Sequence, residues 1–106
     1  MPKYLFEAKY TPEGVQGIKD AGASSRAKAV NDMAAGVGGS LESFHFAFGD
    51  VDAYVIVDLP DDEAAAAVAF QVGTSTTTRV KTVKLLTLDE ADAAVARAID
   101  YRPPGN

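Results

Sequence analysis

The fold of this 106-residue chain is decided by a short strand-like segment, AYVIVDL, at residues 53–59. Alternate residues of a strand point to opposite faces of its sheet. One face of this segment holds Val55, Val57 and Leu59. The other face holds Tyr54 and Ile56. Because one layer of helices can bury only one of these apolar faces, we expect a twin sheet from a second copy of the chain to cover the other.

The segments on either side predict three more strands. Residues 3–10 and residues 41–48 alternate with the period of two that is typical of strands. Residues 76–86 are rich in Thr and Val, which favour strands. Turn-forming Gly and Asp occupy much of residues 49–52, so the second and third strands are expected to form a hairpin.

Helix-start signals lie between the strands. TP at residues 11–12 predicts the start of a helix. Glycines within this helix and a second start signal, SS at residues 24–25, predict that it is divided into two pieces. The second piece is expected to end at residues 36–39. PDDE at residues 60–63 opens an alanine-rich helix. TLDE at residues 87–90 matches a capping box and opens a C-terminal helix, whose apolar stripe is expected to close the domain.

The resulting order is strand, helix, strand, strand, helix, strand, followed by a helix. This is the α+β, ferredoxin-like βαββαβ arrangement, in which two main helices cover one face of a four-stranded antiparallel sheet. No linker or low-complexity tract divides the chain. We therefore expect a single domain over residues 1–101 with an extra C-terminal helix, and a loose C-terminal tail over residues 102–106.

Composition excludes several functional classes. The chain has no Cys, which rules out disulfide scaffolds, zinc fingers and thiol catalysis. Its net charge of −5 repels phosphate backbones, so we expect no nucleic-acid partner. No stretch approaches the roughly 18–20 apolar residues of a membrane span, and the N-terminus lacks a secretory apolar region, which predicts a cytoplasmic protein with no membrane partner. The chain also has no P-loop, dinucleotide fingerprint or nucleophile elbow.

His45 is the only histidine, and histidine titrates near neutral pH. Alternation along residues 41–48 places it on one face with Leu41 and Ser43. The opposite face holds Phe44, Phe46 and Phe48, which we assign to the helix-covered core. His45 then points into the interior of the dimer, either as a catalytic base or ligand, or as a hydrogen-bonded interface residue without chemistry.

Other side chains are candidates for a ligand site around His45. They are Glu7, Tyr54, Asp58 and Arg79. Arg79 and its neighbour Lys81 could bind a carboxylate or phosphate, or could simply protect a solvated edge strand. Asp50 and Asp52 favour a turn rather than a cation site, so we expect no metal and no cofactor.

The chain resembles the GYD domain family over about residues 4–94. The resemblance is carried by YTPEG at 10–14, the segment around the paired glycines at 38–39, FGDVD at 48–52, PDD at 60–62, and RVKTV at 79–83 leading to TL at 87–88. In one departure, Val51 stands where the Gly-Tyr-Asp signature has its tyrosine. The resemblance implies a homodimer or higher homo-oligomer, in which facing sheets enclose a dimeric α/β barrel.

The family resemblance implies no agreed activity, and whether the protein is an enzyme stays open. The first hypothesis is a protein that binds a small apolar or aromatic molecule between its sheets. The alternative is an enzyme, similar to cofactor-independent monooxygenases or haem-handling proteins of the same architecture, that uses His45. A third hypothesis is a purely structural oligomer.

Overall fold

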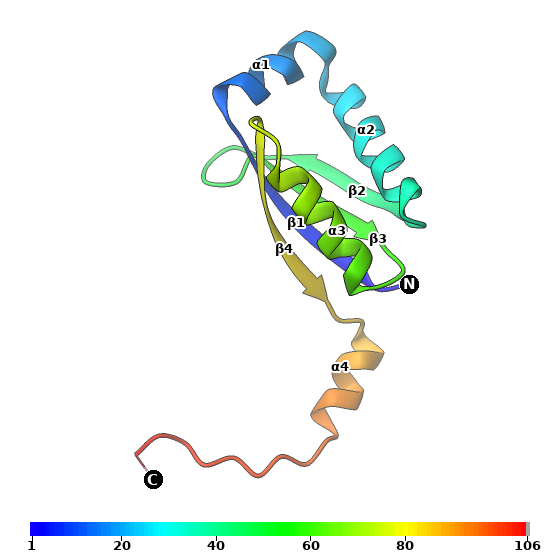
Figure 1. Ribbon diagram of the computed structural model, residues 1–106. Helices are drawn as coiled ribbons and strands as arrows, with labels where there is room; N and C mark the ends of the chain where they lie inside the picture. Colours follow the sequence, from blue (N-terminus) through cyan, green and yellow to red (C-terminus); the bar gives the residue numbers. More distant parts are fainter. Residues whose placement is uncertain (106) are drawn as a thin grey trace.

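The strands and helices follow the predicted order, and the computed structural model describes residues 1–105. The strands are β1 (Lys3–Tyr10), β2 (Ser40–Phe46), β3 (Ala53–Asp58) and β4 (Thr78–Leu85). The helices are α1 (Pro12–Ala21), α2 (Ala23–Gly36), α3 (Asp62–Gly73) and α4 (Leu88–Val95). The strands pair antiparallel in the order β2-β3-β1-β4, which confirms the ferredoxin-like α+β fold (Figure 1).

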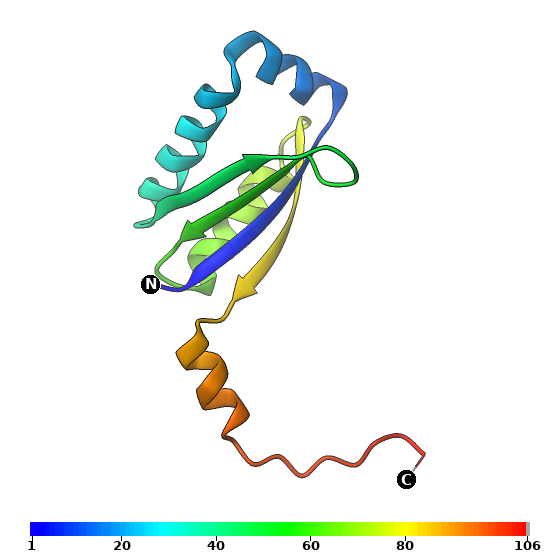
Figure 2. The same ribbon diagram turned by 180° about the vertical axis from the view of Figure 1, so that it is seen from behind.

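The hydrophobic core lies between the sheet and the helices on one side of it, and we call this side the covered face. Seen from behind, the strands lie in front of α3, and no helix lies over them (Figure 2). The strands contribute Tyr4, Phe6, Ala8, Ala53, Val55 and Val57 to the core. The helices contribute Val30, Ala34, Ala65 and Val68. The period of two in β1 and β3 therefore selects the buried residues, as predicted.

The predicted caps of α1 and α3 are confirmed. Thr11 Oγ1 accepts a hydrogen bond from the backbone N–H of Gly14 at 3.3 Å. Asp61 Oδ1 accepts one from the N–H of Ala64 at 2.8 Å. Each cap satisfies one of the backbone donors that a helix leaves free in its first turn.

The long helix is in two pieces, as expected, but its break is made by Gly22. This residue has φ +93°, a conformation that favours glycine. Ser24 and Ser25 lie inside α2 and provide no cap, so that part of the prediction is wrong. At the other end of α2, Gly38 has φ +87° and its N–H donates to Ala35 O, so the glycine forms a left-handed C-terminal cap.

A β-bulge in β2 changes which side chains face the core. The register between β2 and β3 shifts between Leu41 and Ser43, so Leu41 packs against the core although alternation placed it beside His45. Phe44 also packs there, whereas Phe46 is 42% exposed. Phe48 is 100% exposed because β2 ends at Phe46, so its assignment to the core is wrong.

The C-terminal helix begins where the sequence predicted, but its apolar residues do not pack on the domain as expected. Thr87 and Glu90 form both hydrogen bonds of the capping box. The helix ends at Val95 and extends away from the sheet, with the last residues beyond it (Figure 1). Its apolar residues lie in solvent, with Leu88 84% and Val95 85% exposed. The expected closure of the domain by this helix is therefore wrong for the single chain.

Candidate functional site

The second side of the sheet, which we call the open face, carries a row of polar side chains across all four strands. The register pairs His45 of β2 with Tyr54 of β3, Tyr54 with Glu7 of β1, and Glu7 with Lys81 of β4. Neighbouring strands lie about 4.8 Å apart, so this polar row spans about 14 Å. The structure thus brings together three of the five predicted site residues: His45, Tyr54 and Glu7.

An apolar band lies beside the polar row. Two residues further along each strand, the register joins Ile56 of β3 to Leu5 of β1, and Leu5 to Val83 of β4. All three side chains are half-buried by their neighbours on the sheet and have no helix above them. The open face therefore offers apolar surface and hydrogen-bonding groups side by side.

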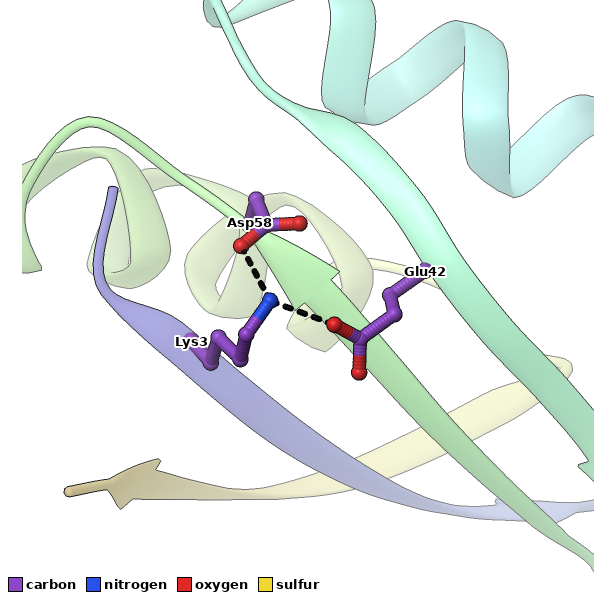
Figure 3. Close-up of polar contacts among 3 residues, drawn as sticks. All are labelled: Lys3, Glu42 and Asp58. Carbon is purple, nitrogen blue, oxygen red and sulfur yellow. Dashed lines mark hydrogen bonds and ion pairs between the residues drawn. The ribbon is translucent and has the colours of Figure 1, made fainter. Parts of the chain in front are cut away.

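An ion cluster occupies the end of the open face beyond the apolar band (Figure 3). Lys3 Nζ lies 2.8 Å from Asp58 Oδ1 and also pairs with Glu42. The hydrogen bonds to Asp58 and then to Glu42 raise the pKa of Lys3. Asp58 is four residues from Tyr54, or about 13 Å along the strand. Asp58 thus shares the face with His45, but its charge is paired with Lys3 and it is not a neighbour of the polar row.

A cleft of about 400 Å³ lies at the other end of the open face, next to the β2–β3 loop. Its lining includes Glu7, Lys9, Asp50, Val51, Arg79 and Lys81. The Arg79 guanidinium donates to the backbone oxygens of Ser75 at 2.6 Å and Thr78 at 2.9 Å, which hold it beside its own strand. Lys9 and Val51 were missed as site residues, although the period of two in β1 places Lys9 on the same face as Glu7.

His45 itself is exposed and makes no hydrogen bond or ion pair within residues 1–105. A catalytic base works best when a second group orients its ring. Tyr54 is the cross-strand neighbour of His45 and is 40% exposed, but no bond joins the two side chains. The single chain therefore presents an accessible imidazole without an orienting partner.

The turn aspartates have a structural use. Asp52 Oδ2 accepts a hydrogen bond from the backbone N–H of Tyr10 at 2.9 Å, and the Asp52 N–H donates to Ala8 O. Asp50 is exposed. No group of three or more His, Asp or Glu side chains in residues 1–105 has an arrangement that could hold a metal ion. Asp52 thus ties the β2–β3 loop to β1, a contact between segments far apart in the sequence that its turn propensity did not predict.

A polar cluster on the covered side was not found from the sequence. The hydroxyl of buried Tyr4 donates to Asp62 Oδ1, and Lys84 Nζ lies 2.8 Å from the same oxygen. Burial, followed by the bond to Asp62, raises the pKa of Tyr4 to about 12. Lys84 and then Tyr4 lower the pKa of Asp62. The cluster joins the start of α3 to β1 and β4, and we assign it to stability.

The chain matches the family model of the GYD domain over residues 4–95. No curated protein and no solved structure matches the chain. None of the helices in residues 1–105 has the length and apolar character needed to cross a membrane. The matched segment begins at the second residue of β1 and ends at the last residue of α4, so it includes every helix and all of the sheet except Lys3. The chain therefore belongs to the GYD domain family.

Proposed function

We propose that two copies of this chain pair through the open faces of their sheets and bind a small apolar or aromatic molecule between them. The observation that carries the proposal is the apolar band formed by Leu5, Ile56 and Val83, which no helix of the chain covers. Apolar surface that is removed from water stabilises an association by about 25 cal/mol per Å². A twin sheet offers a flat surface of matching shape and the same band.

The area of the sheet limits how the pair is built. Four strands about 4.8 Å apart and about seven residues long make a face of roughly 20 by 23 Å. A stable interface buries about 800 Å² on each partner. The sheet alone supplies part of this area, and the exposed apolar side chains of α4, Leu88 and Val95, are available to supply more by packing on the partner.

The polar row sets the chemistry of the bound molecule. Tyr54 offers an aromatic ring for stacking together with a hydroxyl, and Glu7 and His45 offer hydrogen-bonding groups on either side of it. With the apolar band alongside, such a site favours a small molecule that is mostly apolar and carries one or two polar atoms. Arg79 and Lys81 border the same space and attract a partial negative charge.

One observation favours an enzyme as the second candidate, namely that the His45 imidazole is free of any partner within residues 1–105. In that case His45 accepts a proton from a bound substrate, in a reaction similar to those of cofactor-independent monooxygenases. The site fits a haem ligand less well. A ligating histidine normally donates its second ring N–H to a fixed acceptor, and within residues 1–105 His45 has no such acceptor.

The pairing is tested by native mass spectrometry and sedimentation of gently purified protein, comparing two variants. Ile56→Lys places a charge in the apolar band, whereas Phe70→Lys places one on an exposed residue of α3. We expect the wild type and Phe70→Lys to be dimers and Ile56→Lys to be a monomer. A wild type that is monomeric at micromolar concentration, or an Ile56→Lys variant that remains dimeric, would overturn the proposal.

The same spectra separate binding from catalysis. A dimer with extra mass identifies the class of the bound molecule, which is then tested as a ligand and as a substrate. His45→Ala should retain binding if the protein is a binding module. It should abolish oxygen consumption or substrate turnover if His45 is the base, and unchanged turnover would remove His45 from the mechanism.

A further inference from the structure

A second cleft lies on the helix side of the molecule, away from the open face. It has a volume of about 230 Å³ and lies between α1, the start of α2 and the segment that leads into β4. The lining residues that matter here are Tyr10, Glu13, Gly17, Gly22, Arg26 and Thr77. Figure 1 shows α1 and α2 meeting at an angle above the segment that leads into β4.

Arg26 of α2 is the unusual residue of this cleft. It is half-buried, and its Nε atom is shielded from solvent with no hydrogen-bond partner. No hydrogen bond or ion pair within residues 1–105 involves its guanidinium. A buried donor without an acceptor costs about 1–3 kcal/mol, and a charged donor costs more. Fully buried arginines are normally paired, and the half-buried Arg26 has no acceptor within residues 1–105.

Arg26 also borders a small apolar channel. This channel has a volume of about 30 Å³ and lies in the core, between α2, α3 and the covered face of the sheet. The apolar residues around it include Phe6, Val30, Met33, Phe44 and Val72. Arg26 thus lines both the cleft and this small apolar channel. An occupant that pairs with Arg26 needs an acceptor group, and its apolar body must lie in the larger cleft, which Ile18, Ala21 and Ala29 also line.

We propose that this cleft binds a small organic monocarboxylate whose carboxylate pairs with Arg26. The planar guanidinium matches a carboxylate with two parallel hydrogen bonds. The cleft is smaller than the roughly 300–1,000 Å³ of sites for drug-sized ligands, which limits the body to a short aliphatic chain or one aromatic ring. A helix such as α4, about 10–12 Å across with its side chains, is too large for it.

The charge of Glu13 narrows the class of ligand. Its side chain is exposed, lines the same cleft and accepts a hydrogen bond from Thr76 Oγ1 at 3.2 Å. A carboxylate at this place repels a second negative charge. The cleft therefore favours a monoanion over inorganic phosphate or a dicarboxylate.

The first test is an isothermal titration of the full chain with hexanoate and benzoate, with hexanamide and benzamide as uncharged controls. Saturable binding of the carboxylates is expected, and Arg26→Gln should weaken it by roughly tenfold or more. Lys28→Gln is the matched control, because Lys28 lies on the same helix and is exposed, where it pairs with Asp32 at 3.0 Å. This control removes the same charge and should leave the affinity unchanged.

A second variant fills the cleft without touching Arg26. A Cβ added at Gly17 meets no atom within 4 Å, so Gly17→Val places its side chain in open space and leaves the fold intact. Binding should be lost while the free energy of unfolding is unchanged or slightly raised. Gly14 is not suitable for this test, because its Cβ would lie 2.4 Å from the backbone oxygen of Thr77.

Three results would overturn the proposal. They are no saturable carboxylate binding up to about 10 mM, equal affinity in Arg26→Gln and the wild type, and NMR shifts on titration that centre on Tyr54 and Glu7 instead of Arg26. The last result would move the ligand to the open face. Because the cleft belongs to the helix side, loss of the dimer in Ile56→Lys should leave carboxylate binding intact, which separates this proposal from the one above.

Discussion

The two faces of one sheet differ although the same strands build both. On the covered face, Val57 is 1% exposed and packs among other apolar side chains. On the open face, Tyr54 of the same strand is 40% exposed and stands in a row of polar groups. The covered face is therefore stabilised by side chains of the same chain, whereas the open face has the composition of a surface that binds a partner or a ligand.

Polar clusters on the two faces also differ in their surroundings. The hydroxyl of Tyr4, on the covered side, is bonded to Asp62, and the Tyr4 residue is 2% exposed. The Lys3 cluster of the open face is partly solvated, with the Lys3 side chain 38% exposed. The Lys84–Asp62 pair of the first cluster is also solvated, with side chains 46% and 70% exposed, so water and salt weaken the ion pairs of both clusters. The buried Tyr4 hydroxyl is what distinguishes the covered side, so the faces should respond differently to truncation and to pH.

The largest difference in the free energy of unfolding is expected when the same substitution, valine to alanine, is made once on each face of the sheet. Val57→Ala leaves a void in the buried core and should lower the free energy of unfolding by about 2 kcal/mol. Val83→Ala, on the open face, should cost clearly less at low protein concentration, because Val83 is only half-buried in the single chain. Urea denaturation at several protein concentrations measures both. Equal losses under dilute conditions would show that the open face is as well covered as the core.

The hydroxyl of Tyr4, on the covered side, should make the stability of the protein depend on pH in the alkaline range. Its folded pKa of about 12 lies above the ordinary value of 10.0, so the protonated hydroxyl contributes stability that is complete below pH 10 and is lost as the pH rises toward 12. A change in pKa from 10.0 to about 12 corresponds to at most roughly 2–3 kcal/mol, and solvent screening at Asp62, whose side chain is 70% exposed, makes the loss smaller. Tyr4→Phe should therefore show a flatter alkaline limb than the wild type.

Unfolding measured between pH 9 and 12 tests the role of Tyr4. Tyr101→Phe is the control, since Tyr101 is 69% exposed and its removal should leave the slope unchanged. A wild type and Tyr4→Phe variant with the same alkaline slope would contradict the assignment of the cluster to the stability of the covered side.

The smallest effect is expected at the Lys3 cluster. Lys3→Met leaves the carboxylates of Asp58 and Glu42 without their shared cation, so stability at neutral pH should fall. The fall should be less than for Val57→Ala and should shrink in about 1 M salt, where charges are screened. Thermal unfolding at two salt concentrations checks this, with Lys28→Met as control for an exposed helix pair. A loss that salt does not change would indicate a packing effect of the Lys3 stem.

Local signals predicted most of the fold. Alternation in β1 and β3 identified the residues of each face, and Thr11, Asp61 and Thr87 marked the helix starts. The bulge after Leu41 was not predictable, because it depends on how β2 aligns with β3. The short extent of α4 and its position away from the sheet were also missed, since an apolar stripe does not specify which surface it meets.

The candidate sites were predicted less completely. Alternation placed Glu7, His45 and Tyr54 on one face, and the register then made them cross-strand neighbours. The pairing of Asp58 with Lys3 joins strands that are far apart in the sequence, and no sequence motif predicts it. Arg26 carries no sequence signal at all, because its isolation is visible only once the surrounding elements are in place.

The sequence by itself determined the periodicity of the strands, the caps of the helices and hence the fold of this GYD domain protein, because these depend on residues within about four positions of one another. The tertiary structure decided the register of the polar row, the ion pairs and the two clefts. These depend on contacts between distant segments, and a shift of a single residue in strand register would send each side chain of that strand to the other face.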